Sequence, residues 1–189
     1  RVKAAADADA RAPAAAERGD VVILSGIPAP QRDITKIVIS NGVQFWGTWD
    51  FPDRWAGQGA PVDIAAIAIS ASTCTTMQNQ AIWTYKMGGG STGLGSLRGM
   101  HPGSDVQWNV ADYTTNFTSM ADRGTTRLEV VRTSACSSTG KNIGAAFWYE
   151  ANRGGSVVSV SISLGALSVS YSNPGLNDSF GTAAIYQVI

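Results

Sequence analysis

The feature that most constrains the fold is a strict alternation of apolar and polar residues in SVVSVSISLGALSVSYSN, residues 156–173. Successive side chains of a β-strand point to opposite faces, so a period of two predicts strands with one buried face. Gly165-Ala166 would form a two-residue turn, with glycine at the position where a type II′ turn requires positive φ. We therefore expect a β-hairpin in which Ile162 lies opposite Val169.

Short strand-like segments recur along the rest of the chain, separated by Gly, Asn, Asp and Pro. Many short strands at this spacing favour an all-β fold, an antiparallel β-sandwich resembling a jelly roll. The composition agrees, because 21 glycines and only 15% charged residues suit a turn-rich sheet protein better than a helical bundle. The glycine-rich segment 87–103 is expected to be a flexible loop. The predicted strands are 34–40, 43–49, 62–71, 80–87, 105–110, 126–133, 144–151 and 182–188.

The 189 residues suffice for one sizeable core, and their length does not require a second domain. Residues 1–20 are rich in alanine and lack an apolar face wide enough to dock on a core. We therefore predict an N-terminal arm, 1–20, followed by a single sandwich domain, 21–189. Alone, the arm would be a marginal helix or a disordered segment.

Charge and motif content disfavour several classes of function. The 14 basic and 14 acidic residues cancel, so we expect no nucleic-acid partner. The apolar runs are far shorter than the roughly 20 residues that a membrane helix needs. The glycine-rich segments miss both nucleotide-binding patterns, and we expect no cofactor. The single histidine, His101, makes a Cys/His metal site improbable, and we expect a solvated loop residue there.

Two observations suggest a secreted protein. Residue 1 is Arg rather than Met, which fits either a processed end or an omitted upstream segment, and triplets at Asn116 and Asn177 match the N-glycosylation pattern. Cys74 and Cys136 are 62 positions apart, which excludes a CxxC motif. A disulfide between them would contribute roughly 3–4 kcal/mol in the chain-entropy model, and two buried free thiols are the alternative.

The segment NGVQFWGTWDFPDRWAG, residues 41–57, concentrates aromatic rings beside acidic and basic groups. Tryptophan joins a large apolar ring to one polar group, which suits it to sugar faces and lipid head groups. Our leading hypothesis is a secreted, non-enzymatic protein that binds glycans or membrane surfaces through this segment. An aromatic corner that closes the end of the core is the competing structural interpretation. The predicted site residues are Trp46, Trp49, Asp50, Asp53, Arg54 and Trp55.

Two other functions compete with this hypothesis. A structural subunit of a capsid or an extracellular filament would use residues 1–20 to contact a neighbouring copy, giving a homo-oligomer. A glycosidase would need two carboxylates across a cleft, and Glu129 and Glu150 are the candidate pair on predicted strands. Solvent-facing positions on a sheet explain both glutamates equally well, and we consider a binding protein better supported than an enzyme.

Overall fold

The structure of the protein is a computed structural model that describes residues 30–51, 62–70, 74–85, 90–111, 121, 123–134, 142–152, 157–171 and 177–189. The described regular elements are all β-strands. They are β1 (Gln31–Ile39), β2 (Gly42–Asp50), β3 (Asp63–Ile69), β4 (Thr75–Tyr85), β5 (Gly95–His101), β6 (Asp105–Val110), β7 (Arg123–Arg132), β8 (Asn142–Asn152), β9 (Val157–Ile162), β10 (Leu167–Tyr171), β11 (Asn177–Gly181) and β12 (Ile185–Val188).

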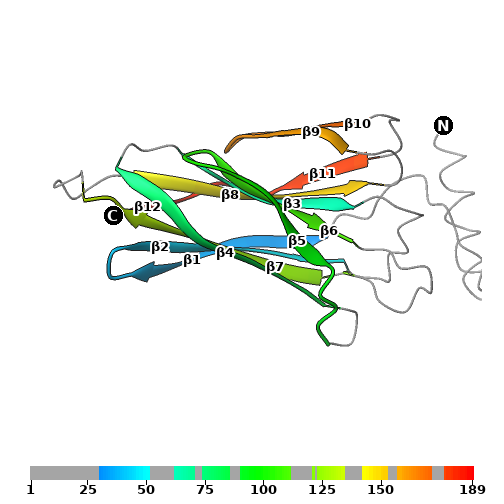
Figure 1. Cartoon of the computed structure of the whole chain (residues 1–189), viewed down its shortest axis with the longest axis horizontal. Helices are drawn as coiled ribbons and strands as arrows, with labels where there is room; N and C mark the ends of the chain where they lie inside the picture. The colour runs from blue at the N-terminus through cyan, green and yellow to red at the C-terminus, as the bar shows by residue number, and fades with distance from the viewer. Residues whose placement is uncertain are drawn as a thin grey trace, which may run out of the picture.

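Two antiparallel sheets pack against each other (Figure 1). One has four strands in the order β1-β2-β7-β4. In the other, of six strands, β11 and β12 both pair with β8, and the order continues through β3, β6 and β5. This arrangement confirms the predicted antiparallel β-sandwich. The predicted arm, residues 1–20, lies outside the described residues, so the division of the chain at residue 20 stays a prediction.

The main core fills the space between the two sheets. Phe45 and Trp49 enter it from β2, and Phe147 and Tyr149 enter it from β8. The Trp49 ring stacks on Phe147 with centroids 6.2 Å apart and is tilted against Tyr149 at 5.1 Å. Gly124, opposite Trp49 on β7, makes room for it, because a Cβ there would lie 2.1 Å from Trp49 Cη2.

The central strand β3 is buried on both faces, which explains its unbroken apolar run. Its alternate residues Ala65, Ile67 and Ile69 face the main core. Ala66 and Ala68 face the opposite way and pack beneath the β9–β10 hairpin in a second, smaller cluster. The hairpin is therefore a third layer, seen above β8 and β3 in Figure 1.

The hairpin itself confirms the prediction from period-two alternation, but its register differs. Ile162 lies opposite Leu167, not opposite Val169 as predicted. The Ser163 amide donates to the Ala166 carbonyl at 2.8 Å, so Leu164 and Gly165 form the two-residue turn. The Ser163 hydroxyl also accepts a hydrogen bond from the Ala166 amide at 3.2 Å, an interaction that favours this turn over the predicted one.

The prediction of a flexible loop over 87–103 is wrong for its second half. Gly95–His101 forms β5, an edge strand that pairs with β6. An edge strand is held by backbone hydrogen bonds on one side, so it needs few large buried side chains. The sequence pattern also missed β11, Asn177–Gly181, which pairs with the end of β8. Both strands lack the apolar alternation that identified the others.

Candidate functional site

Strand β2 presents polar and aromatic residues on the outer face of the four-stranded sheet. Phe45 and Trp49 point into the core, so the intervening Trp46 and the following Thr48 and Asp50 point outward. This is the orientation that strict alternation predicts. The aromatic segment of the sequence is thus divided between the core and the surface.

Strand β7 forms the centre of the same outer face. Its inward residues Leu128 and Val130 belong to the core, and the alternate positions face outward. In the sheet register, Trp46 of β2 lies opposite Arg127, and Trp83 of β4 lies opposite Thr125. The outward residues of β7 are Arg123, Thr125, Arg127 and Glu129.

Three side chains from three strands meet here, and we call them the Trp–Arg cluster: Trp46, Trp83 and Arg127. The two indole rings stack with centroids 5.7 Å apart and planes 9° from parallel. The Arg127 guanidinium carbon lies 5.7 Å from each ring centroid, within range for cation–π attraction. Trp83 keeps 36% of its surface exposed, whereas Trp46 is half-buried. The cluster therefore offers an aromatic surface and a cation to solvent.

An open groove of about 540 Å³ adjoins the Trp–Arg cluster. It lies where β2 and β4 end and β1 and β7 begin. Asp50 and Arg123, which both line the groove, form an ion pair at 3.4 Å with both side chains partly exposed. The groove is lined by Gln31, Arg32, Asp33, Thr48, Trp49, Asp50, Tyr85, Arg123, Gly124 and Thr125. These groups supply many hydrogen-bond donors and acceptors beside an aromatic surface.

The structure brings only some of the predicted site residues together. Trp46 and Asp50 lie on the outer face, but Trp49 is a core residue that is 1% exposed, and its Nε1 donates to the Ala121 carbonyl at 3.2 Å. The expectation that Trp49 contacts a ligand is therefore corrected in favour of the core interpretation. Asp53, Arg54 and Trp55 lie outside the described residues.

The two predicted catalytic carboxylates do not form a pair. Glu129 lies on the outer face of the four-stranded sheet and accepts hydrogen bonds from Gln44 at 3.0 Å and Asn79 at 3.4 Å. Glu150 is on β8, where Tyr149 and Ala151 face the core, so it points out of the other sheet. The whole sandwich separates them. A glycosidase pair requires carboxylates roughly 5–10 Å apart, so this geometry excludes the proposed pair.

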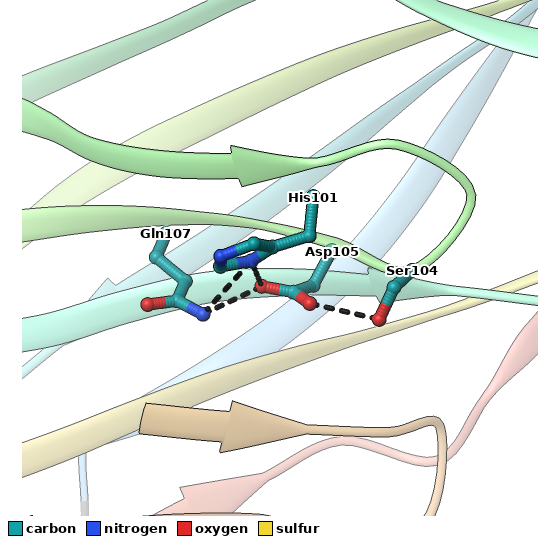
Figure 2. A network of polar contacts seen from close by, with 4 residues as sticks. All are labelled: His101, Ser104, Asp105 and Gln107. Atoms are coloured by element: carbon teal, nitrogen blue, oxygen red, sulfur yellow. Dashed lines mark hydrogen bonds and ion pairs between the residues drawn. The ribbon is translucent and has the colours of Figure 1, made fainter. Parts of the chain in front are cut away.

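A polar network closes the turn between β5 and β6 (Figure 2). His101 Nδ1 lies 2.9 Å from Asp105 Oδ2, and the Gln107 amide donates to the same oxygen at 2.7 Å. The Ser104 hydroxyl donates to Asp105 Oδ1 at 2.8 Å rather than to the histidine, so the three residues are not ordered as a Ser-His-Asp triad. His101 is solvated as predicted, with 57% of its side chain exposed, but it is the last residue of a strand rather than a loop residue, and it pairs with the buried carboxylate of Asp105.

Cys74 is buried at the turn before β4, and its carbonyl accepts a hydrogen bond from the Thr133 amide at 2.9 Å. This contact brings the end of β7 beside Cys74. Cys136 follows three residues later and lies outside the described residues, as does the sequon Asn116. The disulfide between the two cysteines stays a prediction.

The described residues hold no group of three or more His, Cys, Asp or Glu side chains arranged to bind a metal ion. Among the same residues, no helix of a length and hydropathy suited to crossing a bilayer occurs.

Comparisons with known proteins give a distant structural likeness. No protein-family model matches the chain, and no curated protein matches it. Among solved structures it is similar to a chain of "Complete structure of manganese lipoxygenase of Gaeumannomyces graminis and partial structure of zonadhesin of Komagataella pastoris". The identity is 12%, the TM-score is 0.36, and the match covers 88% of this chain and 54% of that one. This chain therefore spans about half the length of the chain that it matches.

Sequence reasoning missed Trp83 and Arg127, the other two members of the Trp–Arg cluster. Both carried a usable signal, because Ile82 and Leu128 are apolar residues that alternate with them on predicted strands. The alternation therefore predicts that Trp83 and Arg127 each lie on an outer face. It does not predict the strand order, which brings β4, β7 and β2 together.

Proposed function

We propose that this protein binds glycans through the outer face of its four-stranded sheet, with the Trp–Arg cluster as the centre of the site. The observation that carries the proposal is the exposed Trp83 ring, stacked on Trp46 beside a polar groove. Sugars have apolar C–H faces and hydroxyl rims, so a sugar site needs an aromatic surface with donors and acceptors around it. Thr48 and Thr125 lie in the same cross-strand row as Trp83, and Asp50 follows in the groove, so these residues can take that role.

A glycan suits this face better than a membrane surface. Four of its polar side chains are held in two pairs, Asp50 with Arg123 and Gln44 with Glu129, and these groups would have to lose solvation on entering a lipid interface. Most of the other exposed apolar side chains lie on strands of the six-stranded sheet, away from the tryptophans: Leu97, Met100, Tyr186 and Val188. The four-stranded sheet exposes two more, Ile37 and Val38, both on its edge strand β1.

The remaining parts of the sequence-based hypothesis belong to the same proposal. The protein acts as a binding module outside the cell, without catalysis, and Cys74 pairs with Cys136. Asp53, Arg54 and Trp55 follow Phe51 at the groove end of β2 and would extend the site. Self-assembly through residues 1–20 is the competing proposal, and the membrane surface is the competing ligand.

The test compares Trp83→Ala with Tyr186→Ala as the matched control, because both remove an exposed aromatic ring and the control lies on β12. A glycan array first identifies a bound oligosaccharide, and calorimetry then measures its affinity. We expect Trp83→Ala to weaken binding about 30-fold, the effect of removing a central aromatic contact, and Tyr186→Ala to have no effect.

Circular dichroism and the thermal midpoint establish that both variants are folded. Equal affinities for the two variants would remove the Trp–Arg cluster from the site. Binding to phosphatidylcholine or phosphatidylserine vesicles with no oligosaccharide bound on the array would replace the glycan by a membrane surface.

A further inference from the structure

We infer that the glycan recognised by this protein is acidic, and that Arg127 binds a sugar carboxylate while Trp83 contacts the sugar ring. This inference rests on the proposed function and names its ligand class. It begins from the state of the Arg127 side chain, which differs from that of the other charged groups on the same face.

Arg127 carries a charge that no described residue compensates. The described ion pairs join His101 to Asp105 and Arg123 to Asp50, and neither includes Arg127. Arg127 also donates no hydrogen bond to a described residue, and among its nitrogens only Nε is buried without a partner. The terminal nitrogens are therefore open to a ligand. They form a planar fork of donors that matches the two oxygens of a carboxylate.

The neighbours of Arg127 define the side from which an anion approaches. Glu129, two residues along β7, lies about 7 Å away along the strand and would repel a carboxylate. Its oxygens accept hydrogen bonds from Gln44 and Asn79, so they are engaged away from the cluster. On the other side are Thr125, which is uncharged, and then Arg123. An anion is thus favoured between Arg127 and the groove, over Thr125.

The tryptophans make this a site for a carboxylate carried on a ring rather than for a free anion. The guanidinium lies against both indoles, which limits its rotamers and reduces the entropy lost when a ligand binds. Trp83 lies opposite Thr125 in the β4–β7 register, so its exposed ring adjoins the position assigned to the anion. A uronic acid presents both parts, an apolar ring face and a carboxylate on the ring.

The experiment measures binding of four acidic oligosaccharides, of galacturonate, glucuronate, mannuronate and guluronate, to the full chain. Each is compared with its carboxyl-reduced form, which keeps the stereochemistry and removes the charge. We expect at least one acidic oligosaccharide to bind at least tenfold more tightly than its reduced form, because a hydrogen bond to a charged group is lost on reduction. The difference should diminish as salt is raised.

Three variants separate Arg127 from general charge effects. Arg127→Gln should remove the preference for the acidic form, whereas Arg98→Gln on β5 of the other sheet makes the same change in net charge and should retain it. Arg127→Lys keeps the charge and loses the fork, so we expect an intermediate preference. Equal losses in Arg127→Gln and Arg98→Gln would overturn the inference, since the preference would then reflect net charge.

The failure of this inference is distinguishable from failure of the proposed function. If neutral glycans bind with an affinity that depends on Trp83, and acidic and reduced forms bind equally, the inference is overturned and the glycan site stands. If acidic oligosaccharides bind with no dependence on Trp83, both are overturned. If no oligosaccharide, acidic or neutral, binds the folded protein, both are overturned as well.

Discussion

At the scale of single residues, the aromatic segment shows how the position of a tryptophan along a strand determines whether its ring lies in the core or on the surface. Trp46 and Trp49 are three positions apart on β2, an odd spacing, so they lie on opposite faces of the sheet. Trp46 stacks on Trp83 at the surface, and Trp49 stacks on Phe147 in the core. Composition alone could not separate them, because both are tryptophans beside polar residues.

The different positions predict different consequences of substitution. Trp49→Ala should lower the free energy of unfolding by about 3–5 kcal/mol, because it leaves a cavity between the sheets and orphans the Ala121 carbonyl. Trp83→Ala, at an exposed ring, should cost under about 1 kcal/mol. Urea denaturation followed by circular dichroism measures both values. A small loss for Trp49→Ala would show that its ring is not a core element.

Sequence reasoning at this scale is limited by what alternation contains. It correctly predicts that Phe45 is buried and that Trp46 points away from it. The alternating pattern does not tell which strands lie side by side. Trp46 meets Arg127 and Trp83 only because β7 lies between β2 and β4. The site is therefore a property of strand order, which links positions 46, 83 and 127 across long stretches of chain.

At the scale of elements, the unbroken apolar run of β3 has its explanation in the third layer. A strand at the outer surface of a two-layer sandwich would alternate, but Ala66 and Ala68 are buried under the β9–β10 hairpin. The small size of these alanines lets the hairpin approach the sheet closely. The sequence shows both the apolar run of β3 and the alternating hairpin, but only the fold shows that the hairpin covers the strand.

The hairpin layer should be the part of the sandwich that opens most easily, because it joins the rest through the small cluster around Ile162. Ile162→Ala should raise the hydrogen-exchange rates of β9 and β10 amides by about 30-fold, equivalent to roughly 2 kcal/mol, the lower end for such truncations. The amides of β2 and β7 should be unaffected. Ser161→Ala, at an exposed neighbour, is the control. Uniform acceleration in all strands would contradict this prediction by making the sandwich one cooperative unit.

At the scale of the whole molecule, the sandwich keeps its two outer faces chemically distinct. The outer face of the four-stranded sheet carries the Trp–Arg cluster and the groove, whereas the outer face of the other sheet is covered in part by the hairpin. Glu129 and Glu150 belong to different faces, so no cleft relates them. Among the described residues, no further layer packs on the outer face of the four-stranded sheet, and such an open face suits a module that binds an extended ligand.

The position of this face predicts what removal of the N-terminal arm will do. All three residues of the Trp–Arg cluster come from β2, β4 and β7, so a form lacking residues 1–20 should remain folded and bind the same oligosaccharide with unchanged affinity. Sedimentation measures the native mass of both forms against the 19.7 kDa of one chain. An intact chain that assembles and a truncated form that sediments as a monomer would make the arm a connector between copies. Binding that persists in such a monomer would then mean that assembly serves to present several glycan sites together, raising avidity without any new contact at each site.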